Sequence, residues 1–542
     1  MTPIRHSDQQ EGRRREQRLR KIHLPPLIQA LLRPSAYSHG AHRVRLAETH
    51  ISWVLLTGAY AYKVKKPVKL PFLDFSSLQL RLDACREELR LNRRFAPELY
   101  LDVVPITGSA EHPLVGGEGV PLEYAVKMRQ FPADRQLDRV LDAGGLSPRD
   151  MEQFGRSLAA LHATLPSAAA GTEYGLPSQV QTPLRDSLHD LLQGTGDDAL
   201  RSRLEQIGQW VTRRGTELAP VFDARRLAGC VRECHGDLHL ANLVSLDQGI
   251  VPFDCIEFSP GLRWIDTVSD TAFLLMDLAH RGHPGLGYAF LNGYLEAGGD
   301  YAGVRTLHYY AVYRALVRAK VAMIRWQSLA VDKRRRQHLD ECIDYVRQAL
   351  YWTRRARPGL ILMHGLAGSG KTRYSGELAE RLPAIRVRSD VERKRMHGIA
   401  PQGRSGSGVG AGIYTVDAGR QVYSHLVDLA RALIEGGETA IIDATFLHQA
   451  ARRHFAALAQ QLDVPMAIVD CQAPPAELER RLVERAREGK DASEADVAVL
   501  RHQLGHNDPL DDAERAHTLT VDTTRAPPFD ALLAQLRTLL GR

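Results

Sequence analysis

Two short stretches of the sequence contain the residue types that hold the phosphates of a nucleotide. Residues 235–242 read HGDLHLAN, and residues 365–372 read GLAGSGKT. The second stretch fits the pattern G-x-x-x-x-G-K-[ST]. There, glycines let backbone N–H groups surround phosphate, the lysine reaches the β- and γ-phosphates, and the hydroxyl binds Mg²⁺. The residues predicted to form this site are Gly365, Gly368, Gly370, Lys371 and Thr372.

The first stretch has the spacing of a different phosphate-transfer site, the D-x-x-x-x-N loop of kinases. In that pattern Asp237 would accept a proton from the acceptor hydroxyl, and Asn242 would bind Mg²⁺. Asp254 follows Asn242 by twelve residues, and a short hairpin between them would return a second acidic group to the same metal. The three side chains therefore predict a second, unrelated site for Mg²⁺ and ATP.

A zinc site is the alternative for the histidines of this stretch. His235 and His239 are four residues apart, but that spacing brings two ligands together only on a helix, and the stretch reads as a loop before a strand. We therefore expect His235 to brace the loop through hydrogen bonds. The six cysteines form no C-x-x-C pair, which favours reduced and mostly buried thiols over a disulfide framework.

A kinase-like site also needs a strand lysine paired with a helix glutamate, to orient the α- and β-phosphates. AYAYKVKK supplies Lys63 and CREELRLNRR supplies Glu88, with Lys65 and Glu87 as alternates. Lys63 and Lys65 share one face of the expected strand, so alternation does not separate them. The stretch KMRQFP (127–132) would be the hinge whose backbone meets adenine.

Two aspartates follow short apolar strands in the C-terminal part of the chain. Asp443 closes TAIID and would act near Mg²⁺, as a strand-end carboxylate does beside a phosphate loop. Asp390, in RVRSDVERKRM, would take the proton of the acceptor hydroxyl. Each could instead cap the turn or helix that follows it.

The elements that must position these residues fall into two patterns. Residues 44–65 alternate and break at Thr57-Gly58, which predicts a β-hairpin. A helix is expected at about 77–94, further strands at 100–107 and 121–131, and helical runs near 149–163, 196–217, 265–281 and 305–353. Beyond Pro358-Gly359, short apolar strands at 360–364, 384–389, 439–443 and 466–470 alternate with helical patterns. That rhythm predicts a parallel α/β sheet.

Residues 35–350 resemble the aminoglycoside phosphotransferase/choline kinase superfamily, through HGDLHxxN followed by a strand with FDxxEF. The resemblance implies a bilobal, protein-kinase-like fold that binds ATP and Mg²⁺. One departure is that no glycine-rich G-x-G-x-x-G loop precedes Lys63. Asp266 and Asp270 could bind a cationic or hydroxylated acceptor, or could serve as a helix cap and an ion-pair partner.

Residues 358–540 resemble the P-loop kinases that include gluconate kinase, chloramphenicol phosphotransferase, zeta toxin and polynucleotide kinase. The matching features are the phosphate loop, SDVERKR and IIDATF. The arginine-rich stretch from Glu479 is similar to their lid, which implies that Arg481, Arg485 and Arg487 clamp phosphate; a solvated helix face would have the same composition. The whole chain resembles bacterial fusions of these two kinds of domain, which names an architecture and no substrate.

The predicted organisation is a basic flexible tail at 1–34, a kinase-like domain at 35–354 and a P-loop domain at 355–542. The net charge of +7 lies partly in the tail, at EGRRREQRLRK. The chain contains no apolar run long enough to span a membrane and no apolar N-terminal signal, which favours a cytoplasmic protein. No basic stripe with interleaved aromatic residues points to nucleic acid.

The sequence thus predicts an enzyme that uses ATP and Mg²⁺ at two sites to phosphorylate hydroxyl groups of small molecules. In one alternative the first domain is a non-catalytic metabolite sensor that regulates the P-loop domain. In the other, the P-loop domain is a nucleic-acid 5′-hydroxyl kinase whose strand is held by the basic tail.

Overall fold

The computed structural model describes residues 24–70, 73–328, 333–354, 357–401, 403–407, 411–488, 493–525 and 529–541. Residues 1–23, which hold most of the predicted basic tail, lie outside these ranges. The chain divides into two compact units. The first unit comprises Met1–Ala143, His235–Asp237 and Ala241–Arg263, and the second comprises Gly144–Cys234, Leu238–Leu240 and Trp264–Arg542.

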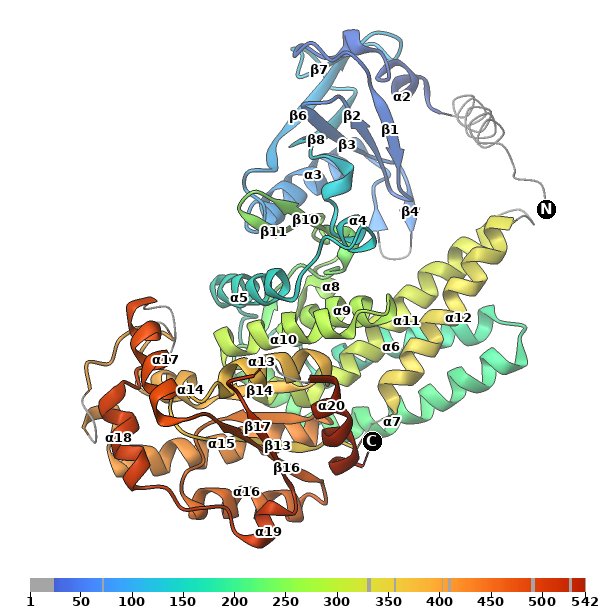
Figure 1. Cartoon of the computed structure of the whole chain (residues 1–542). Helices are drawn as coiled ribbons and strands as arrows, with labels where there is room; N and C mark the ends of the chain where they lie inside the picture. The colour runs from blue at the N-terminus through green and yellow to red at the C-terminus, as the bar shows by residue number, and fades with distance from the viewer. Residues whose placement is uncertain are drawn as a thin grey trace, which may run out of the picture. The chain divides into compact units, whose positions relative to one another are not determined.

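The first unit is built on a six-stranded antiparallel sheet (Figure 1). Its strands, in spatial order, are β1 (Arg45–Glu48), β2 (Ser52–Leu56), β3 (Tyr60–Lys65), β8 (Glu123–Arg129), β6 (Tyr100–Gly108) and β7 (Pro113–Val115). Alternation along β3 places Tyr62 and Val64 in a hydrophobic cluster with Leu55 and Ile106. The lysines of β3 therefore face the opposite side of the sheet.

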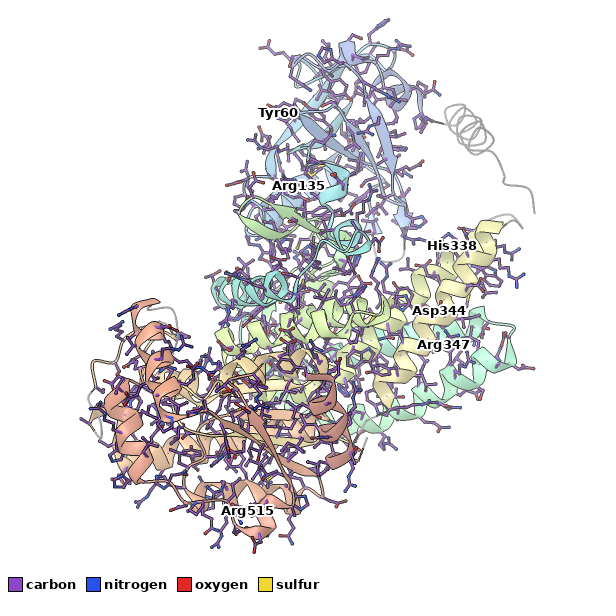
Figure 2. The ribbon with its side chains drawn as sticks, in the orientation of Figure 1. Tyr60, Arg135, His338, Asp344, Arg347 and Arg515 are labelled. Carbon is purple, nitrogen blue, oxygen red and sulfur yellow. The ribbon has the colours of Figure 1, made fainter. Side chains whose placement is uncertain are left out.

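Helix α3 (Leu78–Asn92) packs against β6 and β8. It begins where the Ser77 side chain accepts a hydrogen bond from the Leu80 N–H, which satisfies one of the free donors of the first turn. The remaining elements of this unit are β4 (Lys69–Leu70), β5 (Leu73–Asp74), α2 (Pro26–Ala30), α4 (Leu137–Asp142), α8 (Pro260–Arg263) and the hairpin of β10 (Leu243–Leu246) with β11 (Gly249–Pro252). Figure 2 labels Tyr60 on β3, whose ring lies 4.3 Å from Lys127 Nζ.

The second unit begins with a helical region. Its helices are α5 (Pro148–Thr164), α6 (Pro177–Gly194), α7 (Asp198–Leu227), α9 (Thr267–His280), α10 (Pro284–Gly298), α11 (Val304–Ser328) and α12 (Lys333–Thr353), and β9 (Val231–Glu233) pairs with β12 (Trp264–Asp266). The helical pattern expected at 305–353 is two helices, α11 and α12, packed against each other. Asp344 and Arg347 form an exposed ion pair on α12 (Figure 2). Within the described ranges, none of the helices has the length and hydropathy needed to cross a membrane.

The second unit continues into a five-stranded sheet in which every pairing is parallel. Its strands, in spatial order, are β14 (Ile385–Arg388), β15 (Ala440–Asp443), β13 (Leu360–His364), β16 (Met466–Gln472) and β17 (Thr518–Asp522). The associated helices are α13 (Lys371–Arg381), α14 (Ser389–Met396), α15 (Val416–Gly436), α16 (Gln449–Gln461), α17 (Pro475–Glu488), α18 (Val497–Gly505), α19 (Asp512–Arg515) and α20 (Phe529–Leu539). All side chains of β13 are buried, as expected for the central strand of a covered parallel sheet.

The predicted fold class is confirmed: an antiparallel sheet with a helical region precedes a parallel α/β sheet. Helix α10 packs against α5 and α9 of the helical region and also against α13 and β14 of the sheet region (Figure 1). The two regions therefore form one compact unit, and the domain boundary near residue 355 stays a prediction.

Two candidate phosphate sites

In the first unit, Lys63 lies at the centre of a set of acidic side chains. Its Nζ is 2.8 Å from Glu88 Oε1 and also contacts the Asp254 carboxylate. The Lys63 and Glu88 side chains are buried, whereas Asp254 is 40% exposed. A strand lysine, a helix glutamate and a loop aspartate thus meet at one ammonium group, as the kinase-like reading predicts.

Lys65 occupies the same strand face but has different surroundings. Its Nζ contacts Glu88 and Glu257, and all three side chains are buried. Glu88 therefore contacts both lysines, which lie on the same face of β3. Glu87, the alternate glutamate, instead pairs with Arg90 and Arg263. Glu257 completes this cluster; it is the glutamate of FDxxEF, to which the sequence analysis assigned no role.

The charges of the cluster shift the pKa values of its members. Burial by itself would raise the pKa of Glu88, but Lys63 and Lys65 outweigh it and lower that pKa to about 2. Burial would lower the pKa of Lys63, but Asp254 and Glu88 outweigh it and raise that pKa well above its ordinary value. Glu88 and Lys63 are therefore both charged at neutral pH.

Asp254 has a backbone conformation that few residues other than glycine adopt, with φ of 66°. Two hydrogen bonds hold it there. The Asp254 N–H donates to the Tyr100 hydroxyl at 3.0 Å, and the Cys255 N–H donates to Asn92 Oδ1 at 2.9 Å. Since Asn92 is the last residue of α3 and its amide also donates to the Glu88 carbonyl, the aspartate loop is tied to the helix that carries Glu88.

The loop at residues 235–242 is organised by His235. The Asp237 N–H donates to His235 Nδ1 at 3.3 Å, so the proton of the neutral ring is on Nε2, which lies 2.9 Å from the Phe253 carbonyl. Asn242 Nδ2 donates to Asp237 Oδ2 at 2.9 Å. The hairpin of β10 and β11 then leads to Asp254, so the three predicted residues Asp237, Asn242 and Asp254 belong to one continuous loop-and-hairpin structure.

The donor set of this loop fits Mg²⁺. Hard divalent cations prefer carboxylate and amide oxygens, and the loop provides two carboxylates and one amide. Asp237 and Asp254 are both partly exposed, so a solvated ion has access to them. Asn242 and Asp254 are the residues that would hold the metal, which would neutralise phosphate charge there.

The stretch GLAGSGKT of the second unit lies between β13 and α13. Gly365, Gly368 and Gly370 all have positive φ values, of 133°, 78° and 91°. A Cβ at Gly365 would come within 2.4 Å of the Cys471 carbonyl oxygen, and one at Gly368 within 2.9 Å of the Leu478 carbonyl oxygen. These positions require glycine, and the loop leads directly into the N-terminus of α13. The free backbone N–H groups of a helix N-terminus are suited to binding phosphate.

Lys371 is the first residue of α13 and is buried. Its Nζ donates to the carbonyls of Gly365 and Leu366, at 2.8 Å each, so the ammonium lies over the backbone of the loop. Burial lowers the pKa of Lys371, and the negative charge of Asp443 opposes that shift. The half-buried Thr372 follows it in the first turn.

Asp443 ends β15, the neighbour of β13, and is buried. Its Oδ2 accepts a hydrogen bond from Ser375 at 3.0 Å, and Ser375 lies one turn after Thr372 on α13. Asp443 therefore stands beside the helix turn that carries the predicted metal ligand Thr372.

Asp390 is the second residue of α14 and is half-buried. The N-cap of this helix is Arg388, and no side-chain hydrogen bond caps it, so Asp390 is not the capping residue. Among the residues that the structure describes, none makes a hydrogen bond or ion pair with its carboxylate. Its charge opposes the lowering of the Lys371 pKa by burial, and it adds to the raising of the Tyr414 pKa by burial. Within the described residues, the Asp390 carboxylate is thus without a hydrogen-bond or ion-pair partner, and its charge acts on the lysine of the phosphate loop.

The three arginines of α17 differ in their contacts. Arg481 donates to the Gly368 carbonyl at 3.3 Å and to Thr523 Oγ1 at 2.9 Å, so it joins α17 to the phosphate loop and to the end of β17. Arg485 donates to the Ala495 carbonyl, and its charge lowers the pKa of Lys371. Arg487 is exposed. The structure brings Arg481 and Arg485 near the loop and leaves Arg487 in solvent.

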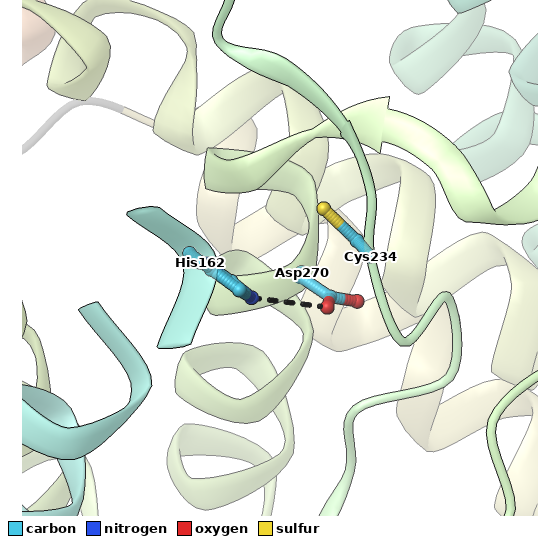
Figure 3. Close-up of side chains that lie close together, drawn as sticks. All are labelled: His162, Cys234 and Asp270. Atoms are coloured by element: carbon cyan, nitrogen blue, oxygen red, sulfur yellow. Dashed lines mark ion pairs between the residues drawn. The ribbon is translucent and has the colours of Figure 1, made fainter. Parts of the chain in front are cut away.

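Asp266 and Asp270, for which the sequence left two roles open, have structural contacts. Asp266 caps α9 by accepting from the Val268 N–H, and it pairs with Arg225. Asp270 Oδ2 lies 3.5 Å from His162 Nε2, with Cys234 close by (Figure 3). His162 Nδ1 is 2.9 Å from the Tyr294 hydroxyl, so His162 links α5 to α10 by a hydrogen bond and to α9 by its ion-pair contact with Asp270.

Comparison with known proteins finds one family model, in the second unit, and relatives that match most of the chain. Residues 360–510 match the family model described as AAA domain, which extends from β13 past the phosphate loop and both strand-end acids. An uncharacterized protein of Mycobacterium tuberculosis is 28% identical over 466 residues, which are 84% of this chain and 89% of the relative. A protein of Mycobacterium bovis matches equally well.

Solved structures match each region separately. A gluconokinase from Sinorhizobium meliloti is 20% identical, with a TM-score of 0.24, and covers 34% of this chain and 92% of its own. A choline kinase from Cryptosporidium parvum is 12% identical, with a TM-score of 0.36, and covers 58% of this chain and 90% of its own.

The predicted combination of a kinase-like region with a P-loop region is confirmed. The first rests on the lysine, glutamate and aspartate set of the antiparallel sheet, and the second on the family match and the glycine loop. Together they support a phosphotransferase as the class of protein.

Proposed function

We propose that the chain is an ATP- and Mg²⁺-dependent phosphotransferase with two nucleotide sites, each of which transfers the γ-phosphoryl group to a hydroxyl of a small molecule. The observation that carries the proposal is the contact of Lys63 Nζ with both Glu88 and Asp254, because decayed kinases usually lose one of these groups. The phosphate loop of the second unit supplies the other site.

In the first site, Lys63 orients the α- and β-phosphates while Glu88 holds the ammonium in place. Asp237 accepts the proton of the acceptor hydroxyl. At the same time the hydroxyl oxygen forms a bond to the γ-phosphorus, and the bond between the γ-phosphorus and the β–γ bridging oxygen breaks. Asn242 and Asp254 would bind Mg²⁺, which would supply positive charge to neutralise the leaving phosphate.

In the second site, the loop N–H groups and Lys371 bind the β- and γ-phosphates. Asp390 orients the incoming hydroxyl and takes its proton. Thr372 would bind Mg²⁺ directly, and Asp443 would act on it through water. Arg481 and Arg485 stabilise the charge of the transferring group, since both act on the loop or its lysine.

A screen of hydroxyl-bearing metabolites with Mg²⁺ and ATP tests the proposal. Phosphorylated products are identified by mass spectrometry for the wild type, Asp254→Ala and Lys371→Ala. We expect products that disappear in one variant and persist in the other. The proposal is wrong if no metabolite is phosphorylated, or if every product persists in both variants.

A further inference from the structure

The open edge of the parallel sheet in the second unit is covered by a helix from the other region of the chain. Strand β14 is the last strand of that sheet, so its outer backbone groups have no strand to pair with. The side chain of Asn292 on α10 pairs with backbone groups at this edge. Its Nδ2 donates to the Ala384 carbonyl at 3.0 Å, and its Oδ1 accepts from the Arg386 N–H at 2.7 Å.

The side chains of β14 add an ionic contact with the same helix. Alternation places Ile385 and Val387 in the core, so Arg386 and Arg388 face the other way. Glu296 of α10 lies 3.2 Å from Arg386 and 3.5 Å from Arg388, and its side chain is only 4% exposed. Glu296 also pairs with Arg156 of α5 at 2.9 Å. A buried carboxylate with three cationic partners therefore ties β14 to α10 and α5.

Helix α14, which carries Asp390, is attached to α10 as well. Arg395 of α14 donates to the carbonyls of Glu296 and Ala297, which are among the last carbonyls of α10. These groups lack partners within the helix, and a cation there also complements the helix dipole. Gly299, which follows α10, has φ of 76°, and a Cβ there would come within 2.8 Å of the Arg395 guanidinium. The backbone of α10 therefore ends in a form that accommodates this arginine.

We infer that α10 of the helical region positions the acceptor side of the P-loop site, with Asn292, Glu296 and Arg395 as positioning residues that hold β14 and α14 so that Asp390 faces the phosphate loop. In the sequence, Asp390 lies between Arg388 and Arg395, and both arginines contact α10. In its first turn, α14 has no side-chain cap that could fix it independently. The inference rests on the proposed role of Asp390 as the proton acceptor.

The first test measures amide exchange in the full-length protein. Asn292→Ala removes the acceptor of the Arg386 N–H, so deuterium uptake should increase in peptides that cover β14 and α14. Glu205→Gln, at an exposed glutamate of α7, is the control and should leave that uptake unchanged. Unchanged uptake in Asn292→Ala, or an equal increase in the control, would overturn the inference.

The second test measures ATP turnover by the second unit, with water as the acceptor, in full-length protein whose first site is silenced by Asp254→Ala. Asn292→Ala and Arg395→Gln should each lower kcat on the order of 10- to 100-fold with little change in KM, because a displaced base costs turnover and not nucleotide binding. Arg395→Lys, which keeps the charge and a donor, should restore part of the rate.

A double variant separates positioning from general stability. If Asn292 acts through Asp390, then Asn292→Ala with Asp390→Asn should be no slower than Asp390→Asn alone. Additive losses would overturn the inference, as would a slow Asp390→Asn variant beside an Asn292→Ala variant of normal rate. If Asp390→Asn alone turns over normally, the proposed role of Asp390 is wrong, and the inference fails with it.

Discussion

At the scale of single residues, Lys63 and Lys65 lie on the same face of β3 but have different surroundings. Lys65 is completely buried between Glu88 and Glu257, and it also lies 5.4 Å from the centre of the Phe75 ring. Lys63 shares Glu88 but contacts the partly exposed Asp254. Lys63 is therefore the lysine that can reach a phosphate, and Lys65 is the lysine that keeps Glu88 in place.

Replacing each lysine by methionine should separate these tasks. Lys65→Met leaves Glu257 buried without a counter-charge, so the free energy of unfolding should fall by about 3–5 kcal/mol. Lys63→Met should abolish turnover at the first site with a smaller loss of stability, because Glu88 keeps Lys65. Urea unfolding and ATP turnover in a Lys371→Ala background measure the two effects. A larger stability loss in Lys63→Met would contradict the assignment.

The pKa of Glu88 makes a prediction for stability against pH. Folding lowers this pKa from 4.5 to about 2. The carboxylate therefore contributes stability that is present above pH 4.5 and is lost as the pH falls towards 2. Unfolding by urea at a series of pH values should show this loss in the wild type. In Glu88→Gln the loss over that range should be smaller, and an identical pH profile in both proteins would refute the ionised state of Glu88.

Sequence reasoning gave no role to Glu257, although this residue is the glutamate of the FDxxEF motif. The loop pattern names Asp237, Asn242 and Asp254 because their spacing is set by backbone geometry. Glu257 follows Asp254 by three residues in FDCIEF, but only the folded sheet brings it to Lys65. The choice between Lys63 and Lys65 likewise depends on burial, which the two-residue alternation of a strand does not predict for two residues on the same face.

At the scale of elements, the glycine loop is the part of the second unit most sensitive to a single methyl group. Gly365→Ala should displace the loop, since its Cβ would overlap the Cys471 carbonyl and φ is 133°. The strain should cost about 1–3 kcal/mol and weaken nucleotide binding accordingly. Calorimetry with a non-hydrolysable ATP analogue and Mg²⁺ measures the loss.

Gly419→Ala is the matched control for that substitution. Gly419 lies in α15, and a Cβ there would meet no atom within 4 Å. This change should leave nucleotide binding intact and raise helix stability by up to about 1 kcal/mol, since alanine is the better helix former. Equal nucleotide affinity in both variants would show that the loop does not need glycine at residue 365.

The elements predicted from the sequence are those with a clear period. Strands β13, β15 and β16 are short apolar runs, and α3, α5 and α9 fall close to their expected ranges. Helix α10 was missed because every residue from Gly287 to Glu296 is buried, so it has no exposed polar face and no helical period. Helix α6 was missed too, and it contains Pro183, which reads as a helix breaker.

At the scale of the whole molecule, the predicted phosphate-binding residues fall into two sets, one in each unit. The kinase-like set lies in the first unit, and the glycine loop with its acids lies in the second. Sequence patterns find both sets because each contributing segment has a short motif of its own. They do not find the contact of α10 with β14, since Asn292 and Arg386 are 94 positions apart and carry no shared motif.

The two sites should therefore bind nucleotide independently. The wild-type chain should bind two molecules of a non-hydrolysable ATP analogue in the presence of Mg²⁺. Lys371→Ala should retain only the site of the first unit, because the loop loses its phosphate-binding ammonium. Asp254→Ala should weaken only that first site, since its metal loses a ligand. Lys69→Ala, at an exposed lysine paired with Asp74, is the control and should keep both sites. Isothermal titration gives the stoichiometry of each protein. A wild-type stoichiometry of one that Lys371→Ala abolishes would mean that the cluster of Lys63, Glu88 and Asp254 holds no nucleotide, because the phosphate loop would then account for all binding.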